Sequence, residues 1–367
     1  MTNPLVTLGV PVYRGQDSLP ALLECLRTQS YKEIDVLISV DGRDQVSADA
    51  CEPFLREDSR FRMHIQPSRL GWAGNTDWTM RQRRGAFYIY QQHDDLISPT
   101  YIADLVDAAA RWPKAVLFFS KLRFTGRRGW EISVPSLLGD PIARGLNYLR
   151  RLDWVPFRGL IRGSALDQTS GLLLSDLDPF ESPGTEQRFL AELSLIGEFR
   201  HVEGPTYFKS WHGDNISAKR QDWPRERRVL AQACFAAWQI EVIAPMGDTL
   251  EERRRLFYTA LDRFAGGAFK QMGSALRRQP KANIALRIWD QLKRNKKLTA
   301  AVQGVMPVPF GTRERSVLLA QVFEQLKRDR RLDPSACLGT SWEGLEAKIF
   351  GHYRIRPQKP TARIGTP

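Results

Sequence analysis

The chain of 367 residues has few cysteines, fewer acidic than basic residues and no long hydrophobic run. Its four cysteines, Cys25, Cys51, Cys234 and Cys337, show neither metal-binding nor disulfide spacing, which predicts free thiols in a reducing cytosol. No uninterrupted apolar stretch approaches the length of a membrane span. The start of the chain lacks the basic and apolar regions of a signal peptide. We therefore expect a cytoplasmic protein, with peripheral contact on the inner face of the membrane left open.

The shortage of acidic residues gives a formal net charge of +13, from 54 Lys and Arg against 41 Asp and Glu. Nucleic acid, an anionic membrane and phosphorylated substrates are all compatible partners of such a chain. The excess is marked at 293–297 and 327–331, where solvated helix faces explain it equally well. No nucleic-acid-binding motif accompanies these runs, so nucleic acid is not an expected partner.

Apolar runs and amphipathic stripes alternate along the first 120 residues, which predicts an α/β fold with a mostly parallel sheet flanked by helices. Ser98 and Pro99 predict the N-cap and first position of the last of these helices. The predicted strands are 6–12, 34–40, 61–65, 86–90 and 115–119, and the predicted helices are 18–29, 46–55, 74–84 and 99–112.

Polar residues follow two of these strands at their carboxyl ends. Gln92-His93-Asp94-Asp95 comes directly after 86–90, and Asp41-Gly42 follows 34–40. Ligands of open α/β sheets bind at this edge, and adjacent carboxylates suit a hard divalent cation that holds a diphosphate. A solvated acidic turn that caps a helix is the alternative for the first motif.

Several short motifs, found in one order and spacing, resemble a known enzyme family. They are Val10-Pro11-Val12-Tyr13, Gln29-Ser30-Tyr31, Val40-Asp41-Gly42, Arg69-Leu70-Gly71 with Ala73-Gly74-Asn75, Gln92-His93-Asp94-Asp95, Gly184-Thr185-Glu186 and the segment Trp211-His212-Gly213-Asp214-Asn215-Ile216-Ser217. Together they resemble the inverting family 2 glycosyltransferases of the Rossmann-like GT-A fold, over residues 4–220.

The resemblance implies a nucleotide-diphosphate sugar as donor and a glycan or lipid-linked molecule as acceptor, in glycan or polysaccharide biosynthesis. Glu186 corresponds to the catalytic base, and Asp94 with His212 to the ligands of a divalent cation, Mg²⁺ or Mn²⁺. The residues that correspond to the nucleotide-sugar site are Pro11, Val12, Tyr13, Asp41, Arg69, Gly71, Asn75, Gln92, His93, Asp94 and Asp95.

The sequence departs from the family pattern at two positions. Gln92 replaces the first Asp of D-x-D, so Asp94 is the expected direct metal ligand and Asp95 a structural or supporting residue. Weak or absent metal dependence also fits this change. The base motif aligns in two ways, and we favour Glu186 because Gln187 cannot accept a proton.

Residues 155–178 need a separate interpretation. Arg158 and Arg162 are interpreted as surface residues, with an anionic acceptor or the diphosphate as the alternative ligand. Gly171 to Leu174 is a predicted strand, and Trp130 to Leu152 has no clear family match and is interpreted as an acceptor loop.

The chain is divided into a transferase domain, 1–222, a helical region, 223–357, and an extended tail, 358–367. Simple packing, a cover over the acceptor site, a homo-oligomer interface and membrane docking are the roles considered for the helical region. A non-catalytic sugar-nucleotide-binding or scaffold protein on the same fold is the alternative function, supported mainly by Gln92. The predicted helices of this region are 226–242, 250–269, 283–292, 315–326 and 343–350.

Overall fold

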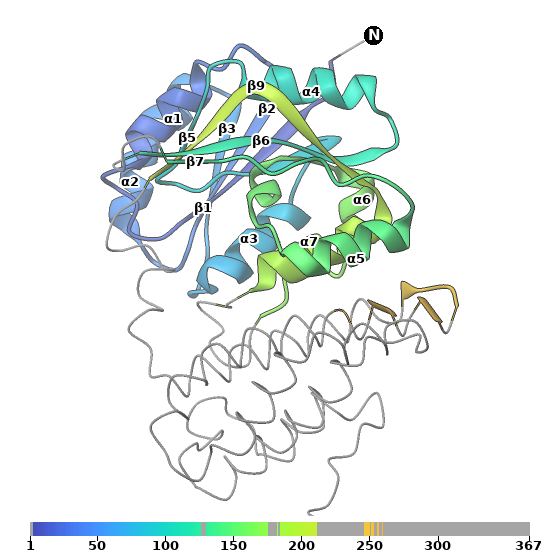
Figure 1. Cartoon of the computed structure of the whole chain (residues 1–367). Coiled ribbons are helices and arrows are strands. Elements are labelled where there is room, and N and C mark those ends of the chain that lie inside the picture. Colours follow the sequence, from blue (N-terminus) through green and yellow to red (C-terminus); the bar gives the residue numbers. More distant parts are fainter. Residues whose placement is uncertain are drawn as a thin grey trace, which may run out of the picture. The chain divides into compact units, whose positions relative to one another are not determined.

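The computed structural model describes residues 3–125, 130–174, 182 and 184–210 in the first of two units, 1–221. In the second unit, 222–367, it describes residues 246–249, 251–252, 255–256 and 259. Nine strands of the first unit form one sheet, with α4 on one side and α3, α5 and α7 on the other in Figure 1. This arrangement confirms the expected α/β fold.

The first half of the sheet is parallel, in the order β3-β2-β1-β4. Every residue of β1, β2 and β4 is buried, as expected of strands that are covered on both faces. Helix α2 packs on α1 and β3, while α3 packs on β1, β2 and β4. The strands are β1 Val6–Val12, β2 Ile34–Val40, β3 Phe61–Ile65 and β4 Phe87–Tyr90, and the helices are α1 Leu19–Arg27, α2 Gln45–Glu57 and α3 Gly71–Arg81.

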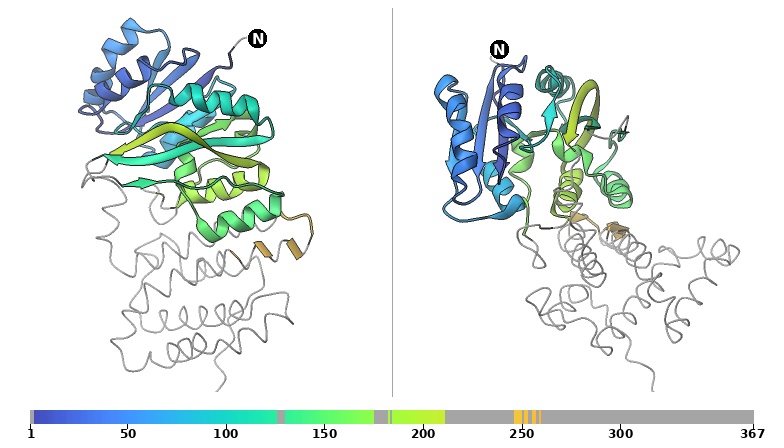
Figure 2. Two further views of the ribbon diagram at one scale, coloured as in Figure 1. Left: turned by 45° about the horizontal axis from the view of Figure 1, so that its top comes forward. Right: turned by 90° about the vertical axis from the view of Figure 1, so that its left-hand side faces the viewer.

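The second half of the sheet is mixed. β8 runs antiparallel to β4 and β6, whereas β9 runs parallel to β6 and antiparallel to β5. Figure 2 shows the long strands β6 and β9 side by side. The bounds are β5 Leu96–Ile97, α4 Tyr101–Arg111, β6 Ala115–Thr125, β7 Glu131–Ile132, α5 Pro141–Arg151, η1 Val155–Arg158, β8 Leu160–Arg162, α6 Gly163–Leu166, α7 Thr185–Ile196 and β9 Glu198–Ser210.

The prediction that Ser98 caps the following helix is wrong, because α4 begins at Tyr101 with Thr100 at its N-cap. Leu96 and Ile97 pair with β9 instead of leading directly into the helix. The pairing continues at Ser98, whose amide donates to Thr206 O at 3.0 Å and whose hydroxyl accepts from Thr206 N at 3.1 Å. The short strand therefore moves the helix start by two residues.

The predicted strand from Gly171 to Leu174 is also wrong, because these residues form no strand. The amide of Leu172 donates to Asp77 Oδ1 of α3 at 2.9 Å. Gly171 has a φ of +74°, and a Cβ there would lie 2.2 Å from the same oxygen, so glycine is needed for this close approach. The segment is therefore held by a helix and not by a neighbouring strand.

Residues 130–152 are not a simple loop, since they contain β7 and α5. Helix α5 packs against α7. The buried side chain of Arg144 joins the two, because it donates to Ser194 O at 2.8 Å and to Leu195 O at 3.1 Å. Asp140 caps α5 through the amide of Ala143 at 2.9 Å.

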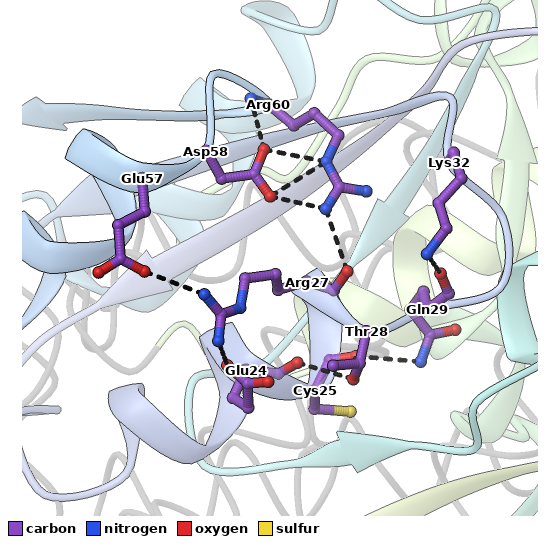
Figure 3. A network of polar contacts seen from close by, with 9 residues as sticks. All are labelled: Glu24, Cys25, Arg27, Thr28, Gln29, Lys32, Glu57, Asp58 and Arg60. Atoms are coloured by element: carbon purple, nitrogen blue, oxygen red, sulfur yellow. Dashed lines mark hydrogen bonds and ion pairs between the residues drawn. The ribbon is translucent and has the colours of Figure 1, made fainter.

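A network of polar contacts fixes the end of α1 (Figure 3). Arg27 donates to Glu57 at 3.0 Å, and Arg60 donates to Arg27 O at 3.0 Å and to Asp58. The side-chain nitrogen Nε2 of Gln29 donates to Ser98 O at 3.1 Å. This bond connects the end of α1 to the segment between β5 and α4. The Gln-Ser-Tyr motif thus has a structural role here.

The described part of the second unit contains one helix start. Thr249 and Glu252 form a reciprocal capping box, with Thr249 N donating to Glu252 Oε2 at 2.9 Å and Glu252 N to Thr249 Oγ1 at 3.2 Å. Residues 251, 252, 255, 256 and 259 are helical, where the sequence predicts a helix from 250. The other predicted helices and the tail lie outside the described residues. Among those described, no helix has the length and apolar character needed to cross a membrane.

Candidate active site

The carboxyl ends of β1, β2 and β4 bring the predicted site residues to one edge of the sheet. The register pairs Val12 with Val40 and Gly9 with Tyr90. Asp41 N donates to Val12 O at 2.8 Å, and Gln91 N donates to Gly9 O at 3.0 Å. Residues 13 and 41 therefore leave β1 and β2 at the same level, whereas β4 ends three residues lower in the register; Pro11 and Val12 stay buried inside β1.

Asp41 shapes the entry to α3. Its buried carboxylate accepts hydrogen bonds from Leu70 N at 2.6 Å and Gly71 N at 2.9 Å. Burial raises the pKa of the Asp41 carboxyl, and these amides together with Arg69 offset part of the rise. Each oxygen already holds one hydrogen bond and keeps further lone pairs for a ligand.

Tyr13 and Arg69 lie together beside Asp41. The guanidinium carbon of Arg69 is 3.9 Å from the centre of the Tyr13 ring, and its Nε is 4.0 Å from Asp41 Oδ2. The Arg69 side chain is 46% exposed, so this pair borders the solvent. A cation over an aromatic ring offers a flat surface that suits a stacked base.

Asn75 has the opposite surroundings, because it is buried between α3 and β2. Ser39 Oγ donates to its Oδ1 at 2.5 Å, and its Nδ2 donates to Ser39 O at 2.8 Å. Gln66 Nε2 completes the group by donating to Ser39 Oγ at 2.9 Å. The side chain of Asn75 thus fastens the glycine-bearing loop and helix to the sheet.

Asp95 is the inner member of the Gln-His-Asp-Asp motif. Its fully buried carboxylate accepts from Tyr207 Oη at 3.0 Å and from Ser210 N at 2.8 Å, and it lies 3.4 Å from Lys209 Nζ. Burial raises the pKa of Asp95, and the charge of Lys209 acts in the opposite direction. These three partners on β9 occupy Asp95 inside the protein.

Gln92 and His93 each have a partner from another element. Lys209 Nζ donates to Gln92 Oε1 at 3.1 Å, and burial lowers the pKa of Lys209 while Asp95 opposes this effect. His93 Nδ1 lies 3.1 Å from Ser18 Oγ. A Cβ at Gly15 would lie 3.1 Å from the same nitrogen, so His93 rests on the loop between β1 and α1.

The donor set for a metal ion is smaller than the family pattern. Among the described residues, no group of three or more His, Cys, Asp or Glu could hold a metal ion. Lys209 contacts Gln92 and Asp95, and the neighbouring Asp94 is the carboxylate that we expect to bind a cation. One carboxylate with substrate phosphates suffices for many Mg²⁺ sites, so the residues fit a cation held mainly by its substrate. His212 lies outside the described residues.

Glu186 lies in the first turn of α7, after Gly184 at a φ of +84°. Thr185 Oγ1 donates to Leu173 O at 2.7 Å and positions this turn. In the described part of the chain, Glu186 Oε2 is buried without a hydrogen bond, and so is Oε1 of Gln187. Both residues of the ambiguous base motif therefore carry an oxygen that no protein group uses.

Tyr90 marks the centre of the site. Burial raises the pKa of its phenol; Arg158 lowers that pKa, and Asp95, Asp94 and Glu186 raise it. The ring centre of Phe157 lies 4.9 Å from that of Tyr90 and 5.8 Å from that of Phe189 in α7, so the end of β4 and α7 pack on the same aromatic ring.

Lys209, Tyr90 and Trp154 belong to this cluster but carry no local sequence signal. Lys209 reaches Asp95 across 114 residues of sequence, so only the pairing of β9 brings the two together.

Arg158 and Arg162 are not the surface residues expected from composition. Arg162 donates to the carbonyls of Ala115, Ala109 and Trp112 and is structural.

Comparison with known proteins identifies this architecture. The family described as glycosyl transferase family 2 matches residues 7–164, which include β1 to β8 and the Gln-His-Asp-Asp motif. The chain contains a family 2 glycosyltransferase domain. The chain is 32% identical to the putative glycosyltransferase EpsH of Bacillus subtilis over 110 residues, 30% of this chain and 31% of EpsH.

Two further relatives extend the likeness of the glycosyltransferase domain. Chondroitin synthase of Escherichia coli is 25% identical over 225 residues, 61% of this chain and 31% of that protein. The structure of S. aureus TarS 1–349 with UDP-GlcNAc matches with a TM-score of 0.51 at 16% identity, over 72% of this chain and 81% of TarS 1–349, and this likeness concerns the fold. The chain spans about a third of the length of EpsH and of chondroitin synthase.

Proposed function

We propose that this chain is an inverting glycosyltransferase that moves a sugar from a nucleotide-diphosphate sugar to an acceptor hydroxyl. The observation that carries the proposal is the convergence of the Gln-His-Asp-Asp motif, in the region that matches family 2 glycosyltransferases, with the start of α7 and its Glu186, on either side of the packed rings of Tyr90, Phe157 and Phe189. Acid groups that come from two distant segments and meet at the ligand-binding edge of the sheet suit a reaction with two charged partners.

Tyr13, Arg69 and Asp41 are assigned to the nucleoside. The base stacks at the Tyr13 and Arg69 pair, and a remaining lone pair of Asp41 accepts a hydrogen bond from the base. Gly71 and Asn75 act indirectly, since they fix the loop that carries Arg69. Gln92 and His93 line the path from the nucleoside to the reacting sugar.

The leaving nucleoside diphosphate gains negative charge as its bond to the sugar breaks. A Mg²⁺ or Mn²⁺ ion, when bound, supplies electrostatic stabilisation of that charge. Asp94 is assigned to hold the ion, with His212 as the second protein ligand. Asp95 supports the motif from inside, and Lys209 adds a positive charge next to Gln92.

Glu186 is assigned as the general base. Its Oε2, which makes no hydrogen bond to the residues that the structure describes, accepts the proton of the acceptor hydroxyl. The hydroxyl oxygen then bonds to the anomeric carbon from the face opposite the diphosphate, and the electrons of the broken C–O bond leave with the diphosphate. A single displacement of this kind inverts the anomeric centre. Polysaccharide biosynthesis, with a glycan or lipid-linked acceptor, is the proposed context.

The remaining assignments concern the rest of the chain. We assign 1–222 to the transferase domain, 223–357 to a helical region and 358–367 to an extended tail. Packing, an acceptor cover, a homo-oligomer interface and docking of a cytoplasmic enzyme on the inner membrane face remain the alternatives for the helical region.

Calorimetric titration of the full chain with UDP, dTDP, GDP and CDP, each with and without Mn²⁺ or Mg²⁺, tests the proposal. Binding of one nucleotide that strengthens with metal and is lost in Asp94→Ala is the expected result. Binding that ignores the metal would move diphosphate stabilisation to the basic residues. Binding to none of the four would contradict the donor site.

A non-catalytic nucleotide-sugar-binding protein is the second candidate, favoured by the amide at Gln92 and its bond to Lys209. The two candidates differ in turnover. Slow hydrolysis of the bound nucleotide sugar in the absence of acceptor, followed by release of the nucleoside diphosphate, supports an enzyme. Tight binding with no hydrolysis and no transfer to any tested acceptor supports the second candidate.

A further inference from the structure

Arg158, the last residue of η1, has a guanidinium group that makes no hydrogen bond in the described part of the chain. Its Nε and Nη1 are buried and have no partner. Nη2 is not among the enclosed atoms, so it is the nitrogen that opens to solvent. The main chain of the same residue is well fixed, because Arg158 O accepts from Tyr101 Oη at 3.1 Å.

Aromatic rings surround this cation. The guanidinium carbon lies 4.8 Å from the ring centre of Trp154, 5.7 Å from that of Tyr90 and 5.8 Å from that of Phe157. Rings stabilise a positive charge without using any N–H donor. They hold the group in place without engaging its N–H donors, of which those on Nη2 open to solvent.

Carboxylates lie near Arg158 but do not bind it. Burial lowers the pKa of the Arg158 guanidinium, but Tyr207, Tyr90, Asp95 and Glu186 act in the opposite direction and together raise it. In the described residues, no carboxylate oxygen lies within the 4.0 Å of an ion pair with its guanidinium. The guanidinium of Arg158 therefore lies near the motif at the end of β4 and near the start of α7. It forms an ion pair with neither among the described residues.

Two other arginines of the same unit show how this chain normally treats an enclosed guanidinium. Arg144 donates hydrogen bonds to the carbonyls of Ser194 and Leu195, and Arg162 donates three to the carbonyls of β6 and α4 and the residue after α4. A charged group enclosed without hydrogen bonds is costly, and proteins retain such groups mainly at functional sites. Of these three arginines, Arg158 is the one whose guanidinium makes no hydrogen bond within the described residues, and it lies beside Tyr90 in the candidate active site.

We propose that Arg158 binds an oxyanion group of a substrate, a carboxylate or a phosphate, between the Gln-His-Asp-Asp motif and Glu186. The planar fork of arginine matches the two oxygens of such a group, and either edge of the fork includes the open Nη2. The inference rests on the proposed function for the identity of the substrates. A phosphate would come from the donor diphosphate, and a carboxylate from an acidic sugar such as a uronic acid.

The test compares the full-length wild type with Arg158→Met, which removes the charge, and Arg158→Lys, which keeps the charge but not the fork. Arg84→Met, at an exposed arginine between α3 and β4, is the matched control. The probes are the nucleoside diphosphate that the wild type binds, UDP-glucose, UDP-glucuronate, inorganic pyrophosphate and free glucuronate. Calorimetry and ligand-induced shifts of the melting temperature are the readouts.

We expect Arg158→Met to weaken binding of the anion by roughly tenfold or more, Arg158→Lys to weaken it partly, and Arg84→Met to bind as the wild type does. Loss of affinity for the nucleoside diphosphate and pyrophosphate identifies the phosphate as the ligand. Unchanged affinity for these two, with loss of the preference for glucuronate or UDP-glucuronate, identifies a carboxylate. Equal affinity of wild type and Arg158→Met for every probe overturns the proposal.

A stability measurement separates this role from a structural one. Without ligand, Arg158→Met should melt at the temperature of the wild type or above it, because the substitution removes an unpaired enclosed charge. A lowered melting temperature without any change in anion binding would overturn the proposal. Arg158-dependent binding of pyrophosphate or glucuronate in a protein that binds no nucleotide would keep this inference and reject the proposed function.

Discussion

The ammonium nitrogen of Lys209 lies 3.1 Å from Oε1 of Gln92 and 3.4 Å from Oδ2 of Asp95. The contact joins the end of β9 to the motif after β4, so one cation holds the two segments together. Because the Lys209 side chain is 10% exposed and that of Asp95 is fully buried, water screens their attraction only weakly.

Lys209→Met should therefore lower the free energy of unfolding by about 3 kcal/mol, since it leaves the buried charge of Asp95 without its cation. Urea unfolding measures this loss. Arg56→Met is the matched control, because Arg56 forms an exposed ion pair with Glu52 and should change stability by less than ~1 kcal/mol. Equal effects of the two substitutions would contradict the assignment of Lys209.

Glu186→Gln should abolish sugar transfer while nucleoside diphosphate binding stays within about twofold of the wild type, because the amide cannot accept the proton. Glu203→Gln, at a side chain that is 91% exposed, should leave both unchanged. Substrate turnover and calorimetry provide the two measurements. Turnover at the wild-type rate in Glu186→Gln would transfer the role of base to another group.

Asp94→Ala should remove the gain in nucleotide affinity that Mn²⁺ or Mg²⁺ produces, because it removes the carboxylate of the motif that is assigned to the ion. The affinity without metal should change little. Calorimetry with metal and with a chelator measures both values. A metal-dependent gain that persists in Asp94→Ala would place the ion elsewhere.

Asn75→Ala should lower the free energy of unfolding by about 2 kcal/mol, because the buried hydroxyl of Ser39 loses the acceptor of its proton and the Ser39 carbonyl loses a donor. Nucleotide binding should fall together with stability, since the loop that carries Arg69 loses its anchor. Asn147→Ala, on the exposed side of α5, is the control for urea unfolding. A stable variant with impaired binding would instead indicate direct contact of Asn75 with the nucleotide.

Ionisation of the Cys51 thiol should lower the free energy of unfolding at alkaline pH. Burial raises the pKa of its thiol from 9.0 to about 12, so the unfolded chain ionises first and the stabilising contribution is lost as pH rises from 9 towards 12. Between pH 8 and pH 10 the wild type should lose about 1.4 kcal/mol more than Cys51→Ala. Urea unfolding at the two pH values measures this difference. Equal losses in the two proteins would show that the thiol does not titrate as inferred.

The parallel half of the sheet could be predicted because its strands are covered on both faces. The bounds predicted for β1 and β2 agree with the structure, since largely apolar runs between turn residues leave little choice. The bounds predicted for β3 agree as well, although this strand at the end of the sheet is partly exposed. Short strands could not be predicted. β5 has two residues and β8 has three, too few for any readable period, and their pairing moved the start expected for α4.

In the candidate site, too, some residues could be predicted from the sequence and others could not. Asp41, Gln92, Asp94 and Asp95 could be placed at one edge because each follows a strand of the parallel sheet. The role of Asn75 could not be read from its motif, since only the packing of α3 on β2 shows that it bonds to Ser39. The surroundings of Arg158 could not be predicted either, since only the structure shows its unpaired nitrogens next to three aromatic rings.

By itself, the sequence determined the α/β fold, the family resemblance and the carboxylates that we assign to the proposed site, because local periodicity and short motifs encode them. Only the tertiary structure decided which charges meet. Lys209 with Asp95, and Glu186 near Arg158, are separated by long stretches of chain. Their proximity depends on the pairing of β9 with β5 and β6 and on the position of η1 beside β4 and α7, which no local pattern specifies.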